Sequence, residues 1–317
     1  MARYFVRRIL VAVPTLLALS FLIFTLVSVA PGDPALELAL RRTSSQEPTP
    51  ETLREIRAEL RLDRPFLAQY GLWLKGAVTG DLGPSFSKKR PVADEIGDRL
   101  GATVELALAS LLLVAVMALP FGVLAAMFHR HWADQALRVG ALVAASVPAF
   151  FLGYLLIIEL ATRLRLLPVA GRQGLPSLIM PAIVVAAIPA AVVSRLLRAS
   201  LLEVFSEDYI RTARSKGLSS AQVVVRHGLR NAAVPVVTYL GTVFGGLLEG
   251  VVITELVFAW PGIGRLTVEA ISQRDYPMIQ AVVLMAGTIY LVVNLGVDLL
   301  YGVLDPRIRV EAGLERV

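Results

Sequence analysis

Few ionisable side chains interrupt the long apolar stretches of this 317-residue chain. If those stretches cross a membrane, each such side chain is a functional candidate, because a charge in hydrocarbon is costly. Glu249 lies deep within its stretch, and Asp298 follows Asn294 by one helical turn within another. Three acidic residues lie nearer to the ends of such stretches, where water can reach them: Glu105, Glu159 and Glu255. Asp298 is either a proton site or the partner of another helix.

The residue types that most enzymes need are missing from these stretches. The chain has no cysteine and no G-x-x-x-x-G-K-[ST] motif, so it has neither thiolate chemistry nor a P-loop for ATP. The pair His129 and His131 could bind a metal, but two imidazoles without a third ligand are more typical of a solvated loop. The third histidine, His227, also lies outside the apolar stretches. We therefore expect no enzyme activity, cofactor or metal site in this chain.

The overall composition is that of a membrane protein. Hydrophobic residues make up 56% of the chain and charged residues 18%, whereas soluble domains average roughly 45–50% and about 25%. The mean hydropathy is +0.68. The net charge is +6, which in a membrane protein commonly reflects basic cytoplasmic loops rather than nucleic-acid binding. We expect a chain that crosses a lipid bilayer several times.

Six stretches of about 20 mostly apolar residues predict six transmembrane helices and an all-α fold. They are Ile9–Ala30, Thr103–Met127, Val139–Ala161, Leu178–Leu196, Val234–Thr254 and Pro277–Leu304. The fourth is short and carries Pro181 and Pro189. The first resembles a signal peptide, but its apolar run exceeds a secretory core of roughly 7–15 residues, which favours an uncleaved anchor.

The distribution of Lys and Arg predicts that both termini are cytoplasmic. With that orientation the inside segments hold 15 of these residues and the two short outside loops hold 5. Basic residues favour the cytoplasmic side of short loops. Three outside residues do not fit this rule: Arg163, Arg165 and Arg172.

The sequence divides into three parts. Residues 1–30 form a tail with the first span, 31–100 a long outer segment, and 101–317 a core of five spans. In the outer segment, Thr49-Pro50-Glu51 predicts a helix start. Residues 65–78 place four side chains on one stripe, which predicts a helix at the outer interface with its aromatic side chains at headgroup depth: Phe66, Tyr70, Trp73 and Ala77. We expect a small helical cap rather than a ligand site.

The fifth span carries glycines at spacings that let another helix approach closely. The pairs are separated by four residues, which places small residues on the same helix faces. These residues are Gly241, Gly245, Gly246 and Gly250. The span is therefore a predicted packing seam, and a partner subunit is a candidate to pack there.

A basic hairpin at about 206–233 separates the fourth span from the fifth. Helix-start and helix-stop signals predict a first helix over about 207–216 that ends at Gly217. Ser219-x-x-Gln222 predicts a capping box for a second helix. The flanking spans hold the hairpin at the membrane face, which argues against DNA binding. A rigid cytoplasmic hairpin in a chain without a P-loop indicates a docking surface for a partner that hydrolyses ATP, whereas a plain amphipathic surface hairpin is the alternative.

The hairpin resembles the cytoplasmic loop of ABC-importer permeases. That loop has an Ala–x3–Gly core, which Ala213 and Gly217 match. Within that superfamily the chain is similar to the dipeptide, oligopeptide and nickel branch. "DYIRTARSKGLS" at 208–219 and "RHGLRNAAVPVVT" at 226–238 carry this resemblance, with "FAWPGIGRL" at 258–266 outside the hairpin. Arg211-Thr212 stands where Glu-Ala is commonest, so a salt bridge assigned to that glutamate is not carried over.

The resemblance implies a type I permease fold in the cytoplasmic (inner) membrane and a set of partners. These are a second permease subunit, two cytoplasmic ATPases that bind ATP and Mg, and an extracytoplasmic solute-binding protein. It implies ATPase contacts for five hairpin residues: Tyr209, Ile210, Ala213, Arg214 and Gly217. It also makes Glu249 a candidate pathway residue and "FAWPGIGRL" a candidate outer gate or dock.

Substrate and energy source leave alternatives open. Within the branch, peptides are the expected cargo, and nickel chelates or oligosaccharides are the alternatives. From another class, an ATP-independent carrier would need an ion-coupling residue, for which Asp298 is the candidate. A membrane regulator that binds DNA through the hairpin is a further alternative.

Overall fold

The computed structural model describes residues 2–42 and 47–304, which form helices joined by short loops. The described part contains no strand and only an isolated bridge between Pro84 and Pro91. The chain divides into two compact units, one built from 103–260 with the end of the last helix and the other from 2–102 with 261–291. The three-part division expected from the sequence stays a prediction.

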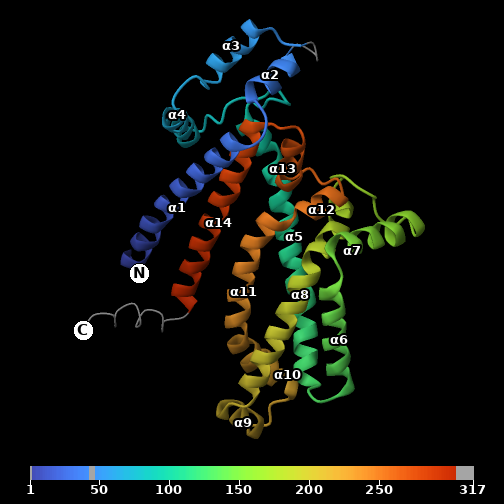
Figure 1. Cartoon of the computed structure of the whole chain (residues 1–317). Helices are drawn as coiled ribbons and strands as arrows, with labels where there is room; N and C mark the ends of the chain where they lie inside the picture. Colours follow the sequence, from blue (N-terminus) through green and yellow to red (C-terminus); the bar gives the residue numbers. More distant parts are fainter. Residues whose placement is uncertain (1, 43–46, 305–317) are drawn as a thin grey trace. The chain divides into compact units, whose positions relative to one another are not determined.

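The first unit packs its long helices around α8. Its elements are the later part of α5 (Val92–Met127), α6 (Trp132–Ser146), α7 (Ala149–Leu156), η1 (Ile157–Arg163), α8 (Leu175–Phe205), α9 (Asp208–Ser215), α10 (Ser220–Val223), η2 (Val224–Gly228), α11 (Leu229–Gly250) and α12 (Val252–Val257). Helices α6 and α11 both run beside α8 (Figure 1). The core between α5, α8 and α11 consists of small and branched side chains, among them Val114, Ala186, Leu197 and Val236. Helix α8 is therefore the central element of this unit.

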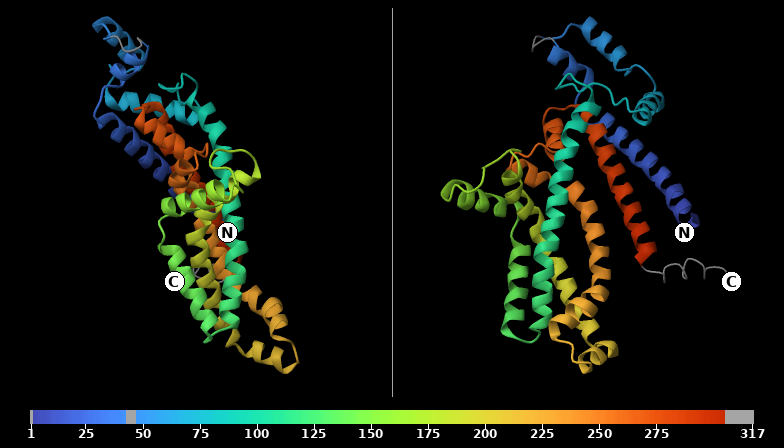
Figure 2. Two further views of the ribbon diagram at one scale, coloured as in Figure 1. Left: turned by 90° about the vertical axis from the view of Figure 1, so that its right-hand side faces the viewer. Right: turned by 180° about the vertical axis from the view of Figure 1, so that it is seen from behind.

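The third predicted span is not one straight helix. Helix α6 ends at Ser146, α7 begins at Ala149, and the two directions differ by 99° (Figure 2). Pro148 lies at the N-cap of α7, where a residue without an N–H can start a helix but cannot continue the one before it. The expectation of a continuous span over Val139–Ala161 is therefore wrong.

Two other predicted spans have different bounds. The fourth is part of α8, which has 31 residues and retains Pro181 and Pro189 within it. The fifth is divided, because α11 ends at Gly250 and α12 begins at Val252. The described residues contain four helices that are long and apolar enough to cross a membrane, or five if α6 and α7–η1 count as one span. Six spans with both termini inside remain a prediction.

Two of the three unexplained arginines have carboxylate partners in the first unit. Arg163 contacts Glu159 one turn before it, with 2.6 Å between Nη1 and Oε1. Arg172 contacts Glu105 on α5, again at 2.6 Å. These pairs balance the two charges locally, but the charge rule counts Lys and Arg rather than net charge, so the exception stands.

A buried ion pair joins the start of α6 to α8. The guanidinium of Arg198 donates to both carboxylate oxygens of Asp134 at 2.7 Å. Asp134 is 2% exposed at its side chain and Arg198 16%. His129 in the preceding turn lies 3.1 Å from the same guanidinium. The α5–α6 turn is therefore fastened to α8.

We expect Arg198→Ala to lower the free energy of unfolding by about 3 kcal/mol, because it leaves the Asp134 carboxylate buried without its main partner. Thermal unfolding of the purified chain in detergent measures this loss. The double variant Asp134→Asn with Arg198→Met is the control and should recover part of the stability. A loss below about 0.5 kcal/mol for Arg198→Ala would show that the pair does not hold the turn.

The second unit comprises α1 (Ala2–Val29), α2 (Pro34–Arg42), α3 (Pro50–Glu59), α4 (Phe66–Thr79), the start of α5, α13 (Ile263–Ser272) and the greater part of α14 (Tyr276–Leu304). The predicted helix start is confirmed, since the Thr49 side chain accepts a hydrogen bond from the Thr52 N–H. Arg42 donates to both carboxylate oxygens of Glu59 at 2.6 and 2.7 Å, which joins α2 to α3. These hydrogen bonds lower the pKa of the Glu59 carboxyl, against a smaller opposing effect of burial.

The aromatic stripe of α4 packs against α1. The Phe24 ring lies 5.4 to 5.6 Å from the rings of Phe66, Tyr70 and Trp73. The Tyr70 hydroxyl is 2.9 Å from the Ser20 hydroxyl. The stripe thus has a protein partner that the sequence did not predict, and it attaches α4 to the first helix.

Asp275, just before α14, is the polar centre of the second unit. Its side chain is fully buried. It accepts hydrogen bonds from the Ser85 hydroxyl at 2.5 Å, the Ser87 hydroxyl at 2.8 Å and the backbone N–H groups of Phe86 and Ser87 at 3.1 and 3.0 Å. One carboxylate therefore fixes the 85–87 turn to the start of α14.

Candidate functional site

The first helix of the hairpin, α9, has one buried and one open face. Ile210 is fully buried and Ala213 is 6% exposed. Both belong to a cluster with Val223, against which Val204 and Leu218 pack. Tyr209 and Arg214 are exposed. Ile210 and Ala213 lie on the same face of α9 because residues three apart on a helix are neighbours.

Gly217 makes the turn that follows α9. Its φ is +81°, a left-handed conformation that disfavours side chains with a β-carbon. Its N–H donates to the Arg214 carbonyl at 2.9 Å, and the Leu218 N–H donates to the Ala213 carbonyl at 3.4 Å. A β-carbon at Gly217 would meet nothing within 4 Å. The glycine is thus required by backbone conformation and not by crowding.

The predicted capping box is confirmed. The Ser219 Oγ accepts from the Gln222 N–H at 3.4 Å, and the Gln222 Oε1 accepts from the Ser219 N–H at 2.9 Å. The helix continues through the π-helical segment η2 into α11. The second arm of the hairpin, α10 and η2, therefore begins at a capped position, Ser219, and continues without a loop into α11.

The hairpin packs tightly on the end of α8. A β-carbon at Gly228 would lie 3.2 Å from the Phe205 ring and 3.3 Å from Leu201. The Arg214 guanidinium lies 6.0 Å from the centre of the Phe205 ring. Both arms therefore contact the same end of α8.

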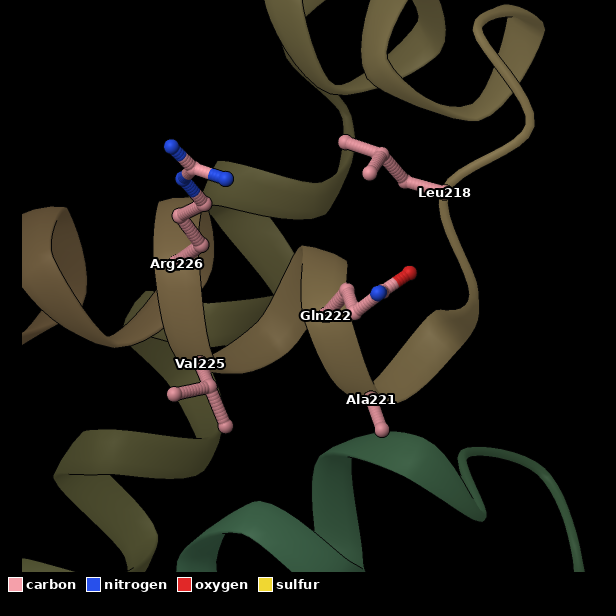
Figure 3. A pocket seen from close by; sticks show the side chains of 5 residues that line it. All are labelled: Leu218, Ala221, Gln222, Val225 and Arg226. Carbon is pink, nitrogen blue, oxygen red and sulfur yellow. The ribbon is translucent and has the colours of Figure 1, made fainter.

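An apolar pocket of about 310 Å³ lies on the second arm (Figure 3). It is lined by Leu218, Ala221, Gln222, Val225 and Arg226. Val225 is 68% exposed. Ala221 is exposed as well.

A polar pocket of about 500 Å³ lies on the other side of Arg226. Its lining consists of Tyr209, Arg226, His227, Arg230 and Asn231. The Asn231 side-chain amide donates to the Tyr209 hydroxyl at 2.7 Å, which joins α9 to α11. The sequence alone could not indicate this bond, because it links residues from different elements.

Several predicted residues lie away from the hairpin. The side chains of Glu249 and Asp298 and the surroundings of Gly245 and Gly250 fall outside the described part of the structure. Gly241 is partly buried on α11, and a β-carbon at Gly246 would meet nothing within 4 Å. The pathway and packing roles of these residues stay predictions. Among the described residues, no group of three or more acidic or histidine side chains could hold a metal ion.

Comparison with known proteins identifies relatives along the whole chain. Residues 118–310 match the family model described as binding-protein-dependent transport system inner membrane component. Residues 1–107 match the N-terminal model of the same membrane component. The chain is 41% identical to the glutathione transport system permease protein GsiC of Escherichia coli strain K12 over 309 residues, which is 98% of this chain and 99% of that protein. The same identity and coverage hold for its counterpart in Shigella dysenteriae.

Solved structures share the fold of part of the chain. An inward-facing structure of the MetNI methionine ABC transporter matches with a TM-score of 0.54 and 18% identity, over 66% of this chain and 96% of that chain. An amino acid ABC transporter with histidines matches with a TM-score of 0.50 and 18% identity, over 68% and 94% of the two chains.

Proposed function

The chain belongs to the family of binding-protein-dependent transport system inner membrane components, and from that premise we propose that it carries peptides inward, powered by ATP hydrolysis on partner subunits. As a member of this family it is a polytopic inner-membrane permease subunit of an ABC importer. The proposed assembly contains a second permease, two ATPases and an extracytoplasmic solute-binding protein. This chain supplies the membrane path and no ATP chemistry.

The hairpin carries the mechanistic part of the proposal. It is a capped, rigid element fixed to the end of α8 through Phe205 and Leu201. ATPase closure beneath it would push α9 and the second arm, and α8 and α11 would follow. The spans then alternate between inward-open and outward-open states, whose populations ATP and the loaded binding protein bias.

The five hairpin residues divide into two groups. Tyr209 and Arg214 are exposed, and Gly217 lies in the turn between the arms. We assign these three to the ATPase contact. Ile210 and Ala213 are buried within the hairpin, so they act from inside by keeping α9 against Val223.

Peptides are the favoured cargo because the 41% identical relative is named for transport of glutathione, a tripeptide. The test is ATP-driven uptake of labelled di- and tripeptides into proteoliposomes that contain this chain, its co-encoded permease and ATPases, and the binding protein outside. Uptake that requires ATP supports the proposal. Uptake by this chain without ATPases would contradict it and favour an ATP-independent carrier, whereas uptake of nickel or oligosaccharides alone would contradict the peptide assignment.

Glu249 is the proposed pathway residue on α11. Glu249→Gln removes the charge and keeps the shape, so it should change the uptake rate or the preference between acidic and basic peptides by about threefold or more. The measurement is uptake kinetics for a series of dipeptides of different charge. Unchanged rates and preferences would exclude Glu249 from the pathway.

A further inference from the structure

The two pockets of the hairpin share one wall and differ in chemistry. Arg226 lines both of them. In the first pocket its neighbours are the apolar Leu218, Ala221 and Val225, together with Gln222, and Val225 is 68% exposed. In the second pocket its neighbours are His227 and Arg230, together with the hydrogen-bonded pair of Tyr209 and Asn231.

We propose that the ATPase surface that receives this hairpin places a carboxylate between Arg226 and Arg230 and an apolar side chain beside Val225. The inference rests on the proposed function and adds the chemistry of the partner. It also states the sign of the charge on each partner. This hairpin carries Arg211-Thr212 where Glu-Ala is commonest, so its contact surface is basic and the ATPase surface is expected to be acidic.

The charges and donors of the polar pocket suit a carboxylate. Arg226 in η2 and Arg230 in α11 both line this pocket, so their side chains reach the same region. Guanidinium groups bind carboxylates through two parallel hydrogen bonds, and such bonds are stronger than neutral ones. The 2.7 Å bond between Asn231 and Tyr209 fixes two further polar groups at the pocket wall. The pocket is therefore prepared for an anion before the partner arrives.

The apolar pocket indicates a protein partner rather than a lipid headgroup. Helix α9 lies at the end of the unit where α8 stops and the second arm leads into α11 (Figure 1). A basic amphipathic element can also lie on an anionic membrane surface, and the lipid comparison in the test below separates that case. Protein interfaces combine apolar centres with charged surroundings and are enriched in Arg and Tyr, which is the combination found here.

Charge reversal tests the inference in the assembled complex. Arg226→Glu and Arg230→Glu are each purified with the co-encoded permease in discs of neutral lipid, and the binding of the ATPase subunits is titrated. We expect each variant to bind the ATPases at least tenfold more weakly than the wild type, with the wild-type affinity falling as salt rises. Lys216→Glu is the matched control, because it makes the same charge change on the hairpin outside both pockets, and we expect less than a threefold effect.

The outcomes separate this inference from the proposed function. ATPase binding by both reversal variants within threefold of the wild type overturns the carboxylate assignment and leaves the importer intact. No ATPase binding by the wild type overturns both. A loss that appears only in discs with anionic lipid overturns the assignment in favour of a headgroup. If a reversal variant fails to assemble with its permease, Arg226→Gln and Arg230→Gln replace it. We expect each of these to bind the ATPases at least threefold more weakly than the wild type. An unchanged affinity would again contradict the inference.

Discussion

Gly217→Val is expected to leave the chain inserted in the membrane and to reduce ATP-driven uptake at least tenfold. The φ of +81° at this position is strongly unfavourable for a β-branched residue, so the turn must open to relieve the strain. A β-carbon there would meet no atom of this chain within 4 Å, so within the chain the effect comes from backbone conformation and not from crowding. The turn sets the angle between α9 and the capped start of the second arm, and both arms reach the proposed ATPase contact.

Gly217→Asn is the matched control for this experiment. Asparagine adopts left-handed conformations more readily than other residues with a β-carbon, so it should retain most of the uptake. The two variants are compared for membrane insertion, ATP hydrolysis and uptake in the same proteoliposomes. Full uptake by Gly217→Val would show that the turn geometry does not matter for coupling.

Asp275→Ala should be the most destabilising single change in the second unit. It leaves the buried Ser85 hydroxyl and the N–H groups of Phe86 and Ser87 without the carboxylate that accepts from them. Hydrogen bonds to charged groups contribute roughly 1.5–3 kcal/mol each, and unpaired buried donors add a penalty. We expect a loss of at least about 3 kcal/mol in the free energy of unfolding.

Thermal unfolding in detergent, together with limited proteolysis near residues 84–91, measures this loss. Asp275→Asn is the control, because its amide oxygen can accept part of the hydrogen bonds, so it should lose less. Equal stability of the wild type and Asp275→Ala would contradict the role of this carboxylate in holding the turn.

The hairpin shows how far local signals predict structure. The Ser219–Gln222 capping box, the turn at Gly217 and the helix start at Thr49 are all present as expected. Each depends on residues within about four positions of one another. Their energetics are decided by nearby backbone groups, so the sequence alone contains the necessary information.

Long-range features were not predictable in the same way. Asp275 meets Ser85 across 190 positions, and α4 packs on α1 through rings that hydropathy assigned to the lipid interface. The 99° bend at Pro148 was missed because prolines are tolerated inside a continuous membrane helix, as Pro181 and Pro189 are in α8. In the hairpin, the burial of Ile210 depends on Val223 of the other arm.

The most direct test of the central claim is cross-linking between the hairpin and the ATPase. The chain has no cysteine, so Val225→Cys introduces a single reactive site on an exposed position of the second arm. In the assembled importer we predict cross-links from this site to an ATPase subunit, with a yield that changes when ATP binds. ATP-driven uptake without any such cross-link would contradict the assignment of the hairpin as the coupling element.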